Sequence, residues 1–166
     1  PYSLLDGGNT TAVRATVALS NLAEHIAERE LSTIQQKLKL SDGDLEVVLT
    51  EAEGPGNVAQ IIAEREQVTA LFTGFGAKKV PAEKVGADVA RSYQNYRRNT
   101  APVDEHLADQ LLLPLAIGAG GAFRTSAPTA HTRTNAQVIQ QFVDVALNIE
   151  KVEEFIWEIT VSPEKN

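Results

Sequence analysis

The sequence contains no cysteine, and acidic residues outnumber basic ones by 22 to 15 over 166 positions. Without cysteine there is no disulfide framework and no thiolate metal site, which fits a reducing compartment, and we expect a cytoplasmic location. The net charge of -7 argues against a protein that binds nucleic acid through bulk electrostatics, because neutralising phosphates takes clustered Lys and Arg. If RNA binds, we expect it to bind locally, at its end.

The sequence also lacks a long apolar run. Pro114 interrupts the longest candidate, so no stretch reaches the ~18 residues that span a bilayer, and the N-terminus has no signal pattern. We therefore expect a soluble protein with no membrane partner. Hydrophobic residues make up 43% of the chain, enough for one good core or for one module with a smaller one inserted.

Periodic patterns divide the chain into an outer and an inner part. Residues 11–19 alternate in polarity, which predicts a strand with one apolar face. After residue 100 we expect, in order, a helix from about Asp104, a strand at 123–126, a second helix, and strands at 145–149 and 155–161. We expect the strand at 11–19 and these later elements to form one βαβαββ unit.

The inner part has its own elements. They are an amphipathic helix within 22–40, a strand at 45–49, a hairpin of 58–64 with 68–75, and a helix from Pro81. The fold class is therefore α/β (α+β), with one βαβαββ unit split by a small α/β domain. The expected domains are residues 1–20 with 101–166, and an insert at 21–100.

The only basic concentration lies on the helix after Pro81. There Lys84, Arg91 and Arg98 fall seven residues apart, nearly on one line. A solvated helix face is the favoured interpretation. The functional alternative is a track for RNA phosphates.

Most candidate chemistry lies between residues 105 and 142. In the helix from Asp104, the side chains of His106, Asp109 and Gln110 share a polar face. Thr134 and Gln137 fit a capping box, which predicts His131 in a loop just ahead of a helix that would favour phosphate. From spacing alone, surface roles are more common for such residues.

Two blocks in this region carry a family resemblance. EHLADQLLLPLAI and SAPTAHTRTNAQVIQQF resemble, in order and spacing, the C-terminal signature of the RNA 3'-terminal phosphate cyclases. The resemblance implies repeated βαβαββ units with a thioredoxin-like insert, and ATP with Mg2+ (or Mn2+) as cofactors. It implies that His131 attacks ATP to carry AMP, that Asp109 and Gln110 line the adenylate site, and that an RNA 3'-phosphate end is the substrate.

Two roles in this site are expectations from chemistry. Asp109 would orient the His131 ring by accepting a proton from its other nitrogen. His106 either lines the same pocket or is a surface histidine of the helix.

The resemblance covers the family's last repeat with its insert, without the two repeats that supply phosphate-binding arginines. We therefore expect a fragment or one half of a split enzyme, inactive or weak alone and completed by a second chain, with self-association as a further hypothesis. Two rival hypotheses are a non-catalytic ribosome-assembly factor, against which His131 argues, and an RNA-binding or interaction module built on the insert.

Overall fold

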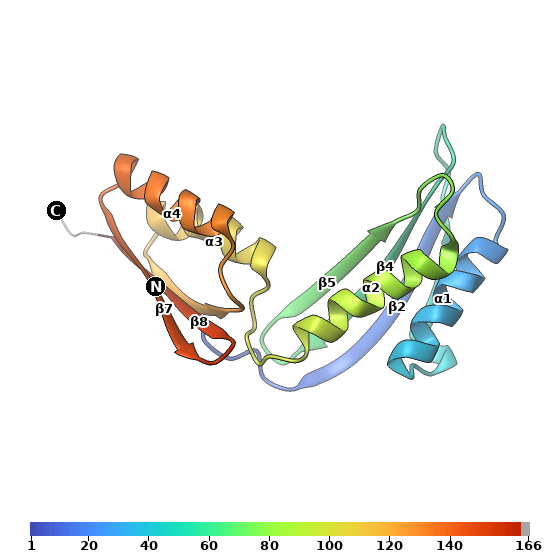
Figure 1. Ribbon diagram of the computed structural model, residues 1–166, viewed down its shortest axis with the longest axis horizontal. Helices are drawn as coiled ribbons and strands as arrows, with labels where there is room; N and C mark the ends of the chain where they lie inside the picture. Colours follow the sequence, from blue (N-terminus) through green and yellow to red (C-terminus); the bar gives the residue numbers. More distant parts are fainter. Residues whose placement is uncertain (164–166) are drawn as a thin grey trace. The chain divides into compact units, whose positions relative to one another are not determined.

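The computed structural model describes residues 1–163, which form two compact units (Figure 1). Residues 1–8 and 98–163 make the outer unit, and residues 9–97 make the inner unit. Each unit has one four-stranded sheet with two helices, which confirms the expected mixed α/β class. Within residues 1–163 no helix is long and apolar enough to cross a membrane.

The outer unit has the strand order β1-β6-β8-β7. Its elements along the chain are β1 (Tyr2–Leu4), α3 (Glu105–Ile117), β6 (Gly121–Thr125), α4 (Ala130–Phe142), β7 (Val145–Glu153) and β8 (Ile156–Pro163). β1 pairs in parallel with β6, and the other pairings are antiparallel. Helices α3 and α4 lie over the same face of this sheet (Figure 1). The core between the layers consists of buried residues such as Leu112, Phe123, Ile139 and Ile159.

The first strand of the outer unit is not the one that the alternating pattern suggested. The strand predicted at 11–19 is β2 (Thr10–Ser20), and in the inner unit it pairs with β3 (Leu45–Leu49) and β4 (Gly56–Arg65). The place expected for it in the βαβαββ order is taken by β1, which lies against Gly121–Phe123. The two units of the structure divide at 8/9 and 97/98, whereas the domain boundaries predicted from the sequence lie at 20/21 and 100/101. Alternation identifies the apolar face of a strand, but it does not identify the sheet that the strand joins.

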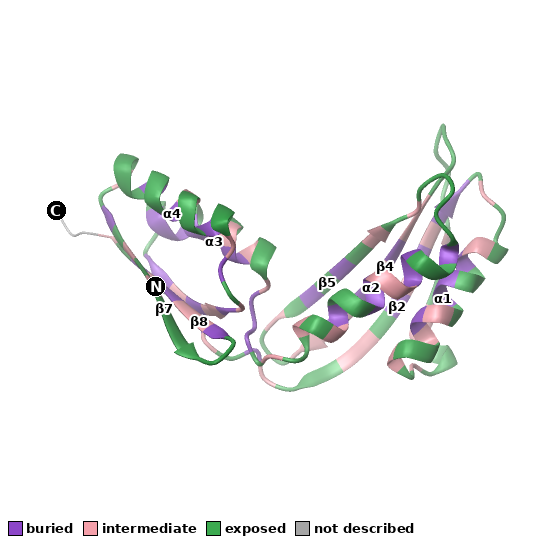
Figure 2. Cartoon of the chain, in the orientation of Figure 1, coloured by how far each residue is buried: buried purple, intermediate pink, exposed green. Residues whose placement is uncertain are grey.

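The inner unit has the strand order β3-β2-β4-β5, with β3 parallel to β2. Its remaining elements are α1 (His25–Leu38), the short 3-10 turn η1 (Asp42–Asp44), β3 (Leu45–Leu49), β4 (Gly56–Arg65), β5 (Thr69–Phe75) and α2 (Ala82–Tyr96). These agree with the elements predicted from periodicity, apart from small shifts at their ends. Figure 2 shows buried residues on the sides of α1 and α2 that face the sheet.

The aromatic residues of α2 belong to this core. The ring centroid of Phe72 lies 5.6 Å from that of Tyr93 and 5.3 Å from that of Tyr96. Tyr93 is 5% exposed, so its ring is not available for stacking on a base. The helical spacing of the two tyrosines thus reflects packing, as expected from the sequence.

Two of the three basic residues predicted to lie in a line on α2, Lys84 and Arg91, are paired with the acidic residue Asp88. Lys84 Nζ lies 2.5 Å from one carboxylate oxygen of Asp88, and Arg91 lies 3.1 Å from the other. The hydrogen bond from Lys84 is the main reason why the pKa of Asp88 is lowered. Arg98 lies beyond the end of α2 and belongs to the outer unit. Pairing of this kind is typical of the solvated helix face that the sequence favoured.

One carboxyl group of the inner unit is buried. Glu30 on α1 is 1% exposed, and its Oε1 accepts a hydrogen bond of 2.5 Å from the side-chain amide of Asn57. Its Oε2 has no hydrogen-bond partner among residues 1–163. Burial raises the pKa of Glu30, and the bond from Asn57 opposes part of that rise.

Candidate active site

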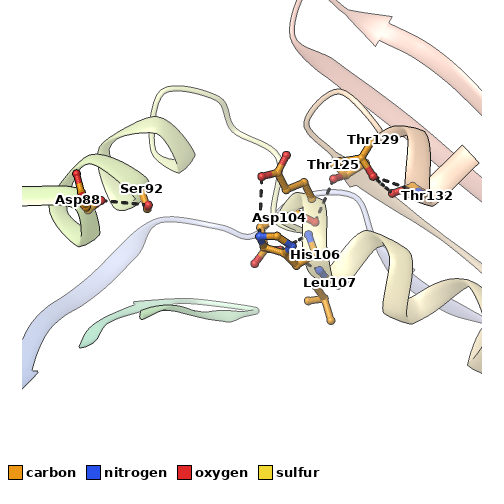
Figure 3. A network of polar contacts seen from close by, with 9 residues as sticks. Asp88, Ser92, Asp104, His106, Leu107, Thr125, Thr129 and Thr132 are labelled. Atoms are coloured by element: carbon orange, nitrogen blue, oxygen red, sulfur yellow. Dashed lines mark hydrogen bonds and ion pairs between the residues drawn. The ribbon is translucent and has the colours of Figure 1, made fainter. Parts of the chain in front are cut away.

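The start of α3 is tied to the end of β6. Asp104 is the N-cap of the helix, and its Oδ1 accepts hydrogen bonds of 2.8 Å from the backbone N–H groups of His106 and Leu107 (Figure 3). The hydroxyl of buried Thr125, the last residue of β6, donates to the backbone oxygen of Asp104 at 3.4 Å. The first turns of α3 are therefore held in a defined place relative to the sheet.

The start of α4 is held by a pair of threonines. Thr129 is the N-cap, and its hydroxyl accepts from the N–H of Thr132 at 3.1 Å and lies 3.0 Å from the Thr132 hydroxyl (Figure 3). The helix begins at Ala130, so the predicted capping box at Thr134 is wrong. The prediction that His131 lies in a loop is also wrong, because this residue lies in the first turn of α4.

His131 and Asp109 are brought together across the two helices. His131 Nδ1 lies 3.0 Å from Asp109 Oδ2. The histidine side chain is 81% exposed, whereas that of Asp109 is only 22% exposed. One ring nitrogen of the imidazole thus lies within ion-pair distance of a partly buried carboxylate. This geometry leaves the second nitrogen, Nε2, available to solvent or to a ligand.

Asp109 is in turn held by a residue that the sequence analysis missed. The side-chain amide of Asn135 donates to Asp109 Oδ1 at 2.9 Å and to the Asp109 backbone oxygen at 3.3 Å. Asn135 lies four residues after His131 on α4, so both side chains face α3. That spacing was visible in the sequence, but its meaning depends on knowing that α4 starts before His131.

An open pocket of about 230 Å3 lies at these two helix starts. Its lining residues are Glu105, His106, Asp109, Gln110, Thr129 and His131. The lining thus includes the four residues that were predicted as a site, which lie on two separate helices: His106, Asp109, Gln110 and His131. His106 is 85% exposed, and its Nε2 lies 3.9 Å from Glu105 Oε1, too far for a hydrogen bond. His106 is therefore an exposed residue of the pocket lining, with no hydrogen bond from its ring to Glu105.

The electrostatics of the pocket are unusual for a site that binds a polyphosphate. Two carboxylates and no Lys or Arg are among its lining residues. Across residues 1–163 no group of three or more His, Cys, Asp or Glu side chains is placed to hold a metal ion. Both oxygens of Asp109 are already within hydrogen-bond distance of His131 and Asn135. These residues therefore do not fit a complete magnesium or triphosphate site.

The fold and this pair of residues define an α/β protein with an oriented, exposed imidazole at a helix start, and comparison with known proteins gives the family. A sequence profile for the insert domain of the RNA 3'-terminal phosphate cyclases matches residues 5–97. The chain belongs to the RNA 3'-terminal phosphate cyclase family, as the two sequence blocks suggested.

Curated relatives named RNA 3'-terminal phosphate cyclase match most of the chain. Identity is 36% over 154 residues with the protein of Salmonella agona (strain SL483), covering 93% of this chain and 44% of that protein. It is 39% over 151 residues with that of Koribacter versatilis (strain Ellin345), covering 90% and 42%. For Pseudomonas fluorescens (strain Pf-5) it is 38% over 160 residues, covering 96% and 47%. The chain thus spans less than half the length of these relatives.

Proposed function

We propose that this chain supplies the nucleophile of an ATP-dependent RNA 3'-phosphate cyclase, which converts an RNA 3'-phosphate end into a 2',3'-cyclic phosphate. The observation that carries the proposal is the His131–Asp109 pair. In a chain of the cyclase family, an 81% exposed imidazole that lines a pocket has its Nδ1 3.0 Å from a carboxylate oxygen. An imidazole placed in this way is a good nucleophile near neutral pH.

In the first step, Nε2 of His131 attacks the α-phosphorus of ATP. The new N–P bond forms as the bond to pyrophosphate breaks, and pyrophosphate leaves with the bonding electron pair. The ring becomes cationic, and the nearby carboxylate of Asp109 stabilises that charge while keeping the ring in position. The product is AMP linked to His131 as a phosphoramidate.

In the second step, an oxygen of the RNA 3'-phosphate attacks the same phosphorus, and the imidazole leaves in its original form. In the third step, the neighbouring 2'-hydroxyl attacks the 3'-phosphorus, loses its proton and expels AMP. Covalent catalysis of this kind replaces one difficult displacement with easier ones. Gln110 and His106, which line the same pocket, are proposed to contact the nucleotide.

The composition of the pocket suggests that this chain does not act alone. Glu105 and Asp109 contribute negative charge beside the place where ATP would bind, and no lining residue is Lys or Arg. A divalent cation such as magnesium or manganese would screen the triphosphate charge when bound, and we propose that its ligands come mainly from the substrate or from residues outside the described part of the chain. We therefore propose that a second chain completes the site and that the isolated chain is inactive or weak.

The test is transfer of label from α-labelled ATP to protein, with magnesium or manganese present. The chain is assayed alone and together with the part of the Koribacter versatilis protein that it does not match. We expect acid-labile label in the complemented mixture and none in His131→Ala. His25→Ala is the matched control, because His25 is exposed at the start of α1 in the inner unit, outside the pocket.

Two results would reject this function. The first is a complemented parent protein that takes up no label, and the second is a His131→Ala variant that takes up as much label as the parent. Either result would favour a family member without nucleotidyl transfer, such as an assembly factor or an RNA-binding module.

A further inference from the structure

Asn135 makes a two-point contact that determines how Asp109 is held. Its amide nitrogen donates both to Asp109 Oδ1 at 2.9 Å and to the Asp109 backbone oxygen at 3.3 Å. Both partners are acceptors only, so the amide group must present its NH2 side here. A side chain bound at two points on another helix has little freedom to rotate.

This contact decides what the other carboxylate oxygen does. A carboxylate that is free to turn presents either oxygen in a range of directions. With Oδ1 occupied by Asn135, the remaining oxygen, Oδ2, faces His131 Nδ1 at 3.0 Å. An ionised carboxylate accepts hydrogen bonds and donates none, so a proton on the ring nitrogen beside it is more stable than a lone pair there.

We propose that Asn135 is a positioning residue that sets the tautomer of His131. By holding Asp109, it keeps the imidazole proton on Nδ1 and leaves the lone pair of Nε2 exposed for reaction. The catalytic meaning of this inference rests on the proposed function, but the tautomer is a property of the chain by itself. A hydrogen bond that fixes the tautomer of a reactive histidine is a recurrent device in enzymes and metal sites.

A simpler role for Asn135 would be to join α3 to α4. Such a tie would contribute to stability and would not affect the histidine ring, since Asn135 has no hydrogen bond to His131 itself among residues 1–163. The two roles therefore differ in one observable quantity, the nitrogen that carries the proton in neutral His131.

The experiment measures this quantity by two-bond 1H–15N correlation spectroscopy on the 166-residue chain, in alkaline buffer where imidazoles are neutral. We expect His131 in the parent to carry its proton on Nδ1 in most molecules. In Asn135→Ala the majority of the proton population should move to Nε2. Thr134→Ala is the matched control. Thr134 is the exposed neighbour of Asn135 on the same helix, and it too is replaced by alanine.

The same variants are then compared in the complemented labelling assay. Asn135→Ala should slow label uptake by about 10-fold, which is the lower end of the loss seen when residues that orient metal-binding histidines are mutated. Thr134→Ala should take up label at the rate of the parent. Asn135→Asp keeps the size of the side chain but replaces its donors with a second carboxylate. We expect it to disturb the tautomer and the rate at least as strongly.

The inference is overturned if parent His131 is protonated mainly on Nε2, a result that needs no variant to fold. It is also overturned if a folded Asn135→Ala or Asn135→Asp chain keeps the parent tautomer. If no protein takes up label, the proposed function fails, and the spectra still decide the role of Asn135.

Discussion

The outer and inner units share an architecture but differ in how their helices begin. In the outer unit, Asp104 and Thr129 each accept a hydrogen bond from backbone N–H groups at a helix start. In the inner unit, neither α1 nor α2 has a side-chain cap; their N-cap positions hold Glu24 and Pro81. Side-chain caps fix the first turn of a helix in register and direction.

The two kinds of helix start differ in the residues that lie beside them. In the outer unit, the pocket residues all lie at the caps or in the first two turns of α3 and α4. In the inner unit, the polar contacts of the helices include exposed ion pairs, such as Arg29 with Glu83, and one buried carboxyl at Glu30. The helices with side-chain caps are therefore the ones that line the pocket. The helices of the inner unit, which lack such caps, pack against their sheet.

The largest expected effect is on stability, and it tests whether the cores of the two units unfold independently. Phe123 in β6 is 0% exposed, and replacing it with alanine should lower the free energy of unfolding of the outer unit by about 3–5 kcal/mol. Phe72→Ala in the inner unit should cost a similar amount there. The single tryptophan, Trp157 in β8, reports on the outer unit by fluorescence. Its denaturant transition should move in Phe123→Ala and not in Phe72→Ala.

If Phe123→Ala and Phe72→Ala shifted the Trp157 unfolding transition equally, the two units would not unfold independently. No strand of one unit pairs with a strand of the other within residues 1–163, which is why we expect the responses to separate. Circular dichroism, which reports on both units, should show two transitions in either variant.

The next effect concerns chemistry and not stability. Asp109→Ala removes the acceptor that lies 3.0 Å from His131 Nδ1, and label uptake in the complemented assay should fall by about 100-fold or more. Glu105→Ala is the control, because Glu105 also lines the pocket but makes no hydrogen bond to His131 within the described residues. If label uptake fell by similar factors in both variants, the reaction would need negative charge in the pocket in general, and not a His131 ring oriented by Asp109.

Much of the fold was predictable because its elements are periodic. The helix at α3, the β4–β5 hairpin and the final two strands follow from apolar spacing and turn residues. β1 was missed because three residues are too few to show alternation. Residues 10–20 were recognised as a strand but assigned to the wrong unit, since pairing partners depend on long-range contacts that no local pattern contains.

The sequence named the candidate site residues but did not give their geometry. The two sequence blocks pointed to Asp109, Gln110 and His131, and helix spacing added His106; all four residues line one pocket. Their roles remain proposals. The sequence around His131 offers several threonines as caps, so the start of α4 was placed too late. The contact of Asn135 with Asp109 depends on how α3 lies against α4, which local spacing does not determine.

A smaller effect is expected from the caps themselves. Asp104→Ala removes two hydrogen bonds at the start of α3 and should lower the free energy of unfolding of the outer unit by about 1 kcal/mol. Glu24→Ala, at the uncapped start of α1, should leave the inner unit nearly unchanged. Equal costs, measured by chemical denaturation, would remove the distinction between the two kinds of helix start.

The last prediction concerns the buried carboxyl of the inner unit, and its sign follows from proton linkage. Because burial raises the pKa of Glu30 above the ordinary 4.5, the folded state holds its proton more tightly than the unfolded state does. The stability of the inner unit should therefore fall as pH rises from 4.5 through the raised pKa, and level off above it. Glu30→Gln, which cannot ionise, should lose this slope in denaturant unfolding measured between about pH 5 and pH 8. Glu83→Gln on α2 changes a carboxyl whose pKa is lowered by its hydrogen bond from Arg29, so it should keep the slope. If Glu30→Gln and the parent show the same pH dependence, the proton is not held at Glu30, and Asn57 alone stabilises its charged form.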